Sequence, residues 1–191
     1  MIIHTARFGE IPVDESKVIT MAGPILGFEQ LDRFILIVPD EKKPFWWLQS
    51  VDDGAVAFVV ANPFAVKPDY EPEIPEEIAL VLQSERPEDA VVLTIVTIRK
   101  DPLKVTLNLK APLVIDPVTK RGGQVVLADP EQPIRFDVTD SLKAAGQSSC
   151  IASRLERLSG SSPCRLRSDG RKLSPRTTIC SRTFQHAGYS V

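Results

Sequence analysis

The chain is poor in the side chains from which metal and catalytic sites are most often built. It has two histidines, His4 and His186, and its three cysteines, Cys150, Cys164 and Cys180, all follow residue 140. The first 140 residues therefore offer His4 no cysteine or second histidine with which to share a metal ion. The cysteines are spaced by 14 and 16 residues and form no Cys-x-x-Cys pair. We expect no metal site, no cofactor and no catalytic residue.

Long apolar runs are also missing. No stretch approaches the roughly 18–20 apolar residues that a membrane-spanning helix needs. The N-terminal residues lack a charged region followed by a long apolar one, as a secretory leader would have. An odd number of cysteines without a leader also argues against a disulfide framework. These absences predict a cytoplasmic protein that does not act at a membrane.

Charge divides the chain into two parts. Residues 1–140 carry 14 Lys and Arg against 23 Asp and Glu, whereas residues 141–191 carry 9 against 2. An acidic body repels nucleic acid and attracts basic partners, and a basic tail could attract nucleic acid or the body itself. We therefore expect a domain over residues 1–140 and a basic Ser/Arg-rich tail over residues 141–191.

The tail has 11 serines and 7 arginines. Ile151, Leu155 and Leu158 have the spacing of one helical face. Residues 161–191 lack the apolar content needed to offset the entropy of ordering, and we expect them to be disordered. The composition also resembles an out-of-frame translation or a shifted gene end, and this interpretation stands beside that of a genuine extension.

The body reads as many short strands separated by turns, with little helix. Strand-like runs occupy residues 2–8, 18–20, 34–38, 45–51, 55–61, 91–98, 105–109, 113–115, 124–127 and 134–138. The run 91–98 is apolar on both faces and is expected to be buried on both sides. A helix is expected over residues 75–82, where a proline and two acids form the first turn. The pattern predicts a mainly β fold, a small antiparallel β-barrel-like domain with one or two short helices.

Four smaller features have structural interpretations. Trp46 and Trp47 adjoin on one strand and must face opposite sides, so we expect one in the core and one at the surface. Asp52, Asp53 and Gly54 are typical of a hairpin turn, with the glycine in a left-handed position. The segment 120–123 predicts a hairpin tip, and Asn108 predicts a buried amide with structural hydrogen bonds.

Several dispersed motifs together resemble the FliW family of flagellar assembly factors. They include the opening Met1-Ile2-Ile3 with Phe8-Gly9-Glu10, the loop Gly23-Pro24-Ile25-Leu26-Gly27-Phe28-Glu29 and the run Leu48-Gln49-Ser50-Val51-Asp52. Phe58-Val59-Val60 with Pro63-Phe64, then Asp69-Tyr70-Glu71, Thr106-Leu107-Asn108-Leu109 and Gly123-Gln124-Val125-Val126-Leu127 follow in the family's order. The resemblance covers roughly residues 1–137.

The resemblance implies a non-enzymatic cytoplasmic protein with two alternating partners. One is flagellin, held before export, and the other is CsrA, an RNA-binding repressor of flagellin translation that the family antagonises allosterically. An RNA binder carries basic surface, which suits an acidic body. We expect Tyr70 to pack on CsrA while nearby carboxylates meet its Lys and Arg side chains. The candidate protein-binding residues are Asp40, Glu41, Asp69, Tyr70, Glu71 and Glu73.

Two functions of other classes remain as alternatives. A hydrolase or carbohydrate-active enzyme on a β-barrel would need two convergent carboxylates in an enclosed site. Nucleic-acid binding would have to come from the arginine-rich tail, since the acidic body is not expected to bind nucleic acid.

Overall fold

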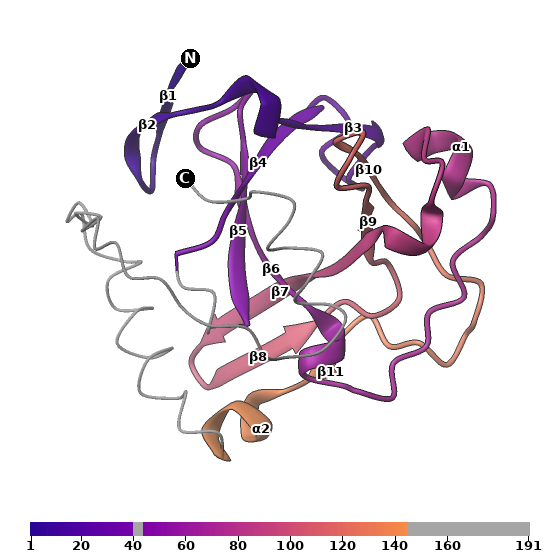
Figure 1. Ribbon diagram of the computed structural model, residues 1–191. Helices are drawn as coiled ribbons and strands as arrows, with labels where there is room; N and C mark the ends of the chain where they lie inside the picture. The colour runs from indigo at the N-terminus through magenta and orange to yellow at the C-terminus, as the bar shows by residue number, and fades with distance from the viewer. Residues whose placement is uncertain (40–43, 145–191) are drawn as a thin grey trace, which may run out of the picture.

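The computed structural model describes residues 1–39 and 44–144. Of the candidate site residues, Asp40 and Glu41 lie outside the described residues, as do the helix and the disorder expected beyond residue 144. The described chain is mainly β with two short α-helices, which confirms the predicted fold class (Figure 1).

Seven strands form a closed ring within the described chain. They are β3 (Ile19–Gly23), β4 (Arg33–Ile37), β5 (Phe45–Ser50), β6 (Ala57–Ala61), β7 (Val91–Lys100), β9 (Leu113–Ile115) and β10 (Arg121–Gln124). Each pairs with the next, in the order β7-β6-β5-β4-β3-β10-β9, and β9 returns to pair with β7. Neighbours in the ring are antiparallel, except that β10 runs parallel to β3. A sheet closed in this way leaves no free edge in its ring.

The remaining strands attach outside the ring. β8 (Leu103–Leu107) continues the sheet from β7, and the short β11 (Phe136–Asp137) pairs with β8. β1 (Ile2–Thr5) and β2 (Gly9–Pro12) make a separate antiparallel hairpin at the N-terminal end of the molecule (Figure 1). The strand-like run over residues 2–8 predicts one strand, whereas the chain turns at residues 6–8 and returns as β2.

Strand β7 contributes to two hydrophobic cores. Val91 and Leu93 point into the barrel, where they join a cluster with Phe34 and Leu48. Val96 belongs to a second cluster outside the barrel wall. The prediction that this strand is buried on both faces is therefore confirmed for its first half, while residues 97–100 reach the surface.

The two tryptophans separate as the alternation of a strand requires. Trp46 is buried inside the barrel, and Trp47 lies partly buried on the outer side, over the third cluster beneath the β1–β2 hairpin. The guanidinium of Arg7 lies 4.3 Å from the Trp47 ring centroid, and the Phe8 ring meets Trp47 edge-on at 5.7 Å. Both contacts serve to hold the hairpin against the barrel.

Gly54 has a different role from the one that the turn motif suggested. It does not adopt a left-handed backbone conformation. Instead, its carbonyl oxygen accepts a hydrogen bond from Ala6 N at 2.9 Å, and a Cβ atom added there would overlap the carbonyl oxygen of His4. A glycine is required because the β1–β2 hairpin approaches the backbone closely at this point.

The hairpin tip predicted at 120–123 is wrong for residues 121–123, which form the start of β10, three residues earlier than the strand expected at 124–127. Gly23 and Gly123 face each other across β3 and β10, and a Cβ on Gly123 would lie 3.3 Å from Gly23 Cα. The two glycines thus allow the close parallel pairing. Asn108 accepts a hydrogen bond from Ala111 N at 3.1 Å, which supports its structural interpretation, although its side chain is only half-buried.

Helix α1 (Ile78–Leu82) lies within the range predicted for it, and α2 (Thr139–Ala144) follows β11. Short 3-10 turns occupy Glu15–Lys17, Pro63–Ala65 and Pro87–Asp89.

A domain boundary at residue 140 would divide α2, and Leu142 from its second half is buried in the second cluster. The folded unit therefore continues past the expected boundary.

The second cluster fixes the segment between β6 and β7. Tyr70 is 2% exposed, and its hydroxyl donates a hydrogen bond to the carbonyl oxygen of Leu109 at 2.8 Å. Ile74 and Ile78 pack against the same cluster, and Leu82 is fully buried in it. Burial raises the pKa of Tyr70 to about 12 because it disfavours the phenolate.

Gly54→Ala should destabilise the protein by about 1–3 kcal/mol, the range for a side chain forced into filled space. Ala55→Ser, at the adjacent exposed position, should change stability by no more than about 0.5 kcal/mol. Chemical denaturation of both variants measures this difference. Equal stability of the two variants would contradict the close approach of the hairpin.

Tyr70→Phe should cost about 1–3 kcal/mol, because it leaves the buried carbonyl of Leu109 without its donor. The raised pKa of Tyr70 also predicts that the free energy of unfolding falls as pH rises from 10, the ordinary tyrosine value, through about 12. Denaturation at several alkaline pH values tests this, and the Tyr70→Phe variant should show a smaller fall. The same slope in both proteins would contradict the buried phenol.

A candidate protein-binding surface around the acidic loop

The segment 68–77, here called the acidic loop, presents carboxylates outward from an anchored backbone. It begins after the 3-10 turn Pro63–Ala65, where the Asn62 side chain accepts a hydrogen bond from Phe64 N at 3.0 Å. Tyr70 N donates to the carbonyl of Lys67 at 3.0 Å, and Ile78 N donates to that of Pro75 at 3.1 Å. These bonds fix both ends of the loop.

Side chains along the loop alternate between core and solvent. Tyr70 and Ile74 point to the second cluster, whereas Glu71 and Glu73 between them are exposed. The alternation follows from the extended backbone, since successive side chains of an extended chain point to opposite sides. Burial of the apolar residues therefore decides where the carboxylates point.

Tyr70 differs from its sequence-based expectation. It was expected to offer its ring to a partner, but the ring is in the core and the hydroxyl is engaged by Leu109. The Phe64 ring lies beside it, with centroids 5.8 Å apart. The role that this geometry supports is that of an internal anchor for the loop.

The carboxylates of the loop differ in how they are paired. The Asp69 side chain is 81% exposed and forms an ion pair with Lys67, in which Nζ lies 2.8 Å from Oδ2. The hydrogen bond from Lys67 holds the pKa of Asp69 below its usual value. Within the described residues, no ion pair or side-chain hydrogen bond engages Glu71, Glu73, Glu76 or Glu77. Four exposed carboxylates in seven residues are thus available to a cationic partner.

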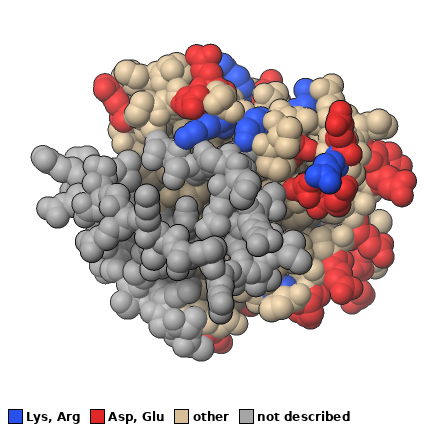
Figure 2. Space-filling view, in the orientation of Figure 1, with Lys and Arg blue, Asp and Glu red and all other residues tan. Residues whose placement is uncertain are grey.

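The same face continues beyond α1. The turn Pro87–Asp89 packs against α1, and Glu85, Glu88 and Asp89 are exposed there. Arg86, the one basic residue of segment 68–90, pairs with Asp89 at 3.5 Å. We call the eight carboxylates of this segment the acidic face: Asp69, Glu71, Glu73, Glu76, Glu77, Glu85, Glu88 and Asp89. Figure 2 shows Asp and Glu side chains gathered on the right-hand side of the molecule, where α1 lies in Figure 1.

Sequence reasoning missed part of this face. The proline and acids at 75–77 predict a helix start and give no separate sign of binding by Glu76 and Glu77, and no motif marks Glu85, Glu88 or Asp89. A count of charges over residues 68–90, with eight acids and one base, would have found them. Asp40 and Glu41, expected in the same patch, lie outside the described residues.

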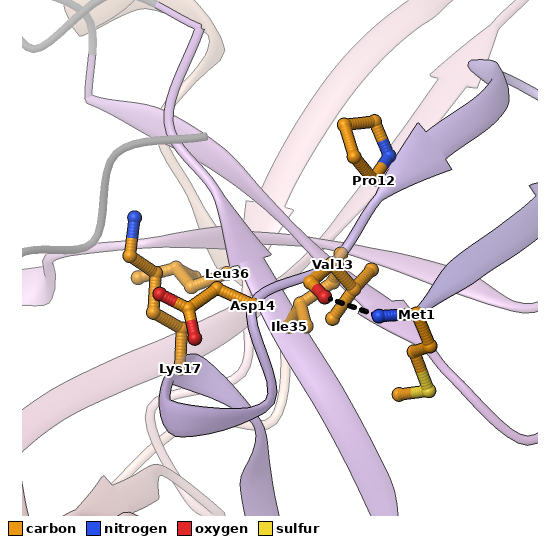
Figure 3. A pocket seen from close by; sticks show the side chains of 7 residues that line it. All are labelled: Met1, Pro12, Val13, Asp14, Lys17, Ile35 and Leu36. Carbon is orange, nitrogen blue, oxygen red and sulfur yellow. Dashed lines mark hydrogen bonds between the residues drawn. The ribbon is translucent and has the colours of Figure 1, made fainter.

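A surface hollow of about 350 Å³ lies elsewhere, below the β1–β2 hairpin (Figure 3). Its lining residues are Met1, Pro12, Val13, Asp14, Lys17, Ile35 and Leu36. Asp14 is the one carboxylate among them, and it accepts hydrogen bonds from Ser16 N and Oγ, which lower its pKa. A second, convergent acid is not among the lining residues, so this hollow gives no support to two-carboxylate hydrolysis.

Other charged groups have structural partners. Asp52 accepts hydrogen bonds from the backbone N of Asp32 and Arg33, and its 2.7 Å ion pair with Arg33 ties the β5–β6 turn to β4. Burial opposes ionisation of Asp52, but these bonds prevail and lower its pKa. His4 lies 3.5 Å from Glu10 on the exposed hairpin. In the described ranges no group of three His, Cys, Asp or Glu side chains has the arrangement of a metal site.

No helix in the described part of the chain has the length and apolar character required to traverse a bilayer.

Comparison with known proteins identifies the family of this chain. A model of the FliW protein family matches residues 2–138. A flagellar assembly factor FliW of Syntrophus aciditrophicus is 46% identical over 138 residues, covering 72% of this chain and 87% of that protein. A FliW of Caldicellulosiruptor saccharolyticus is 39% identical over 143 residues, covering 75% and 93%.

A solved structure agrees with these sequence matches. The crystal structure of a flagellar assembly factor FliW superposes with a TM-score of 0.66 at 29% identity, covering 72% of this chain and 96% of that one. Fold, family model and sequence identity thus coincide over the same region, and the chain belongs to the FliW family of flagellar assembly factors.

Proposed function

We propose that this protein is a cytoplasmic, non-enzymatic regulator that binds two polypeptides in alternation. It holds flagellin as a chaperone, and it binds CsrA and antagonises allosterically the repression of flagellin mRNA translation. When flagellin accumulates it occupies the protein, CsrA is released, and flagellin synthesis falls. Membership of the FliW family supports a role in flagellar assembly, and the identity of the two partners is our proposal.

The observation that carries the CsrA part is the acidic face. CsrA binds RNA and so presents Lys and Arg side chains, which repel one another and favour a surface of opposite charge. Within the part of the chain that the structure describes, no cation pairs with Glu71, Glu73, Glu76 or Glu77 and competes with such a partner. Complementary charge of this kind raises the association rate and selects among partners.

The anchored loop adds preorganisation. Because Tyr70 and Ile74 are held in the second cluster, Glu71 and Glu73 already point outward before a partner arrives. Less conformational entropy is then lost on binding than if a free loop had to order. An encounter with a basic surface therefore needs little rearrangement of this segment.

The other candidate functions receive less support. A hydrolase needs a pair of converging acids in an enclosed site, whereas the acids of the acidic face are exposed to solvent. RNA binding by residues 141–191 concerns a part of the chain outside the described residues, and the acidic face itself repels phosphate.

The double variant Glu71→Lys/Glu73→Lys should weaken CsrA binding by about tenfold or more, since it places like charges at the contact. Binding to flagellin should change less, because its amphipathic helices require apolar contacts. Isothermal titration calorimetry with each purified partner measures both affinities. When the titration with CsrA is repeated at low and at high salt, the loss of affinity in the double variant should be largest at low salt.

Glu10→Lys/Glu15→Lys is the matched control. It changes the net charge by the same amount at exposed positions on and beside the β1–β2 hairpin, on the opposite side of the molecule from α1 (Figure 1). This variant should retain CsrA affinity within about twofold, since screening limits the effect of distant charges. Equal losses in both variants would show that net charge alone matters and would contradict the placement of the site.

A further inference from the structure

Two aliphatic side chains on elements that contact each other, α1 and the turn before β10, project into solvent. Val118 is 84% exposed and Leu80 is 80% exposed, which makes them the most exposed large apolar side chains in the described chain. They are 38 residues apart in sequence but belong to elements that touch each other. Scattered single apolar residues are ordinary on protein surfaces, whereas apolar groups gathered inside a polar rim mark binding sites.

Hydrogen bonds join the two elements. Thr119 Oγ1 donates to the carbonyl of Leu82 at 2.8 Å, and Arg121 Nε donates to that of Val81 at 3.1 Å. The turn carrying Val118 is thus attached to the last carbonyls of α1, which have no partner within the helix. Figure 1 shows α1 beside β10, the strand that follows this turn.

The turn itself is braced from inside. Asp116 is buried and accepts hydrogen bonds from Val118 N and Thr119 N, each at 2.7 Å. Burial alone would raise the pKa of Asp116, but hydrogen bonds from Ser84 and from this turn lower it. Val118 is therefore held outward by a carboxylate that stays ionised.

Among the residues that the structure describes, Leu80 belongs to none of the hydrophobic clusters. On α1, Ile78 and Leu82 face the second cluster, and Leu80 lies on the opposite side, where a soluble helix ordinarily carries a polar residue. Glu76 and Glu77 precede it by one turn, and Glu85 follows the helix. The leucine is thus an apolar point with carboxylates on either side of it.

We propose that Leu80 and Val118 are the apolar anchor of the acidic face, and that the occupant is a basic polypeptide surface with aliphatic side chains among its Lys and Arg residues. This inference rests on the proposed function, because CsrA is the partner of that chemistry. Charge complementarity favours it over an amphipathic flagellin helix, which needs an apolar groove. Two aliphatic side chains projecting among carboxylates do not make a groove. The carboxylates raise the association rate, and the two apolar side chains lower the dissociation rate by excluding water from the contact.

The double variant Leu80→Ser/Val118→Ser in the full-length chain tests the anchor, with Ile2→Ser as the control. Ile2 is 65% exposed on β1, on the other side of the molecule. Since all three side chains are exposed, their replacement should leave thermal unfolding unchanged. We expect affinity for purified CsrA to fall about tenfold or more in the double variant, the size of burying one or two aliphatic side chains. Ile2→Ser should stay within about twofold.

Surface plasmon resonance separates this inference from the proposed function. We expect the loss in the double variant to lie in the dissociation rate, with the salt dependence of binding kept. Unchanged CsrA affinity in this variant, alongside a loss in Glu71→Lys/Glu73→Lys, would overturn the anchor and leave the proposed function standing. Loss of flagellin binding instead of CsrA binding would also overturn it. Failure of the unmodified protein to bind CsrA would overturn both.

Discussion

The position of the acidic face is set by side chains of segment 64–82 that pack into the second hydrophobic cluster. Tyr70, Ile74, Ile78 and Leu82 enter that cluster, and the hydroxyl of Tyr70 is satisfied by the Leu109 carbonyl. Without these four buried side chains, a segment with so many carboxylates would bury too little apolar surface to offset the conformational entropy lost when it adopts one conformation. The acidic face is therefore a consequence of the core beneath it.

Strand β7 connects this core to the barrel. Val91 and Leu93 fill the barrel interior, while Val96 lies under the segment that carries the acidic loop. Ring closure through β9 leaves β7 with partners on both edges over its first half. The acidic loop consequently packs on a cluster to which a paired strand of the barrel wall contributes, and this packing reduces the entropy that the loop would lose on binding.

Much of the scaffold is predictable from sequence because its signals are local. The apolar run of β7 and the alternation at Trp46 and Trp47 each predict the local structure correctly, and α1 lies within the predicted helix, although it begins at Ile78, after the proline and the two acids expected in its first turn. The exceptions depend on contacts between distant residues. Gly54 is a glycine because β1 lies on it, Tyr70 is buried because the chain folds back on Leu109, and the turn that carries Val118 is attached to α1 through Thr119 and Arg121. Sequence indicated an acidic binding loop, but its inward and outward sides became distinguishable only with the fold.

We expect a basic partner to dock on the acidic face of residues 68–90. Hydrogen–deuterium exchange of the full-length protein, alone and with saturating CsrA, measures where the partner binds. Peptides covering the acidic loop and α1 should exchange more slowly in the complex, with the β1–β2 hairpin unchanged. Protection of the hairpin or of β4, with unaltered exchange over residues 68–90, would contradict it.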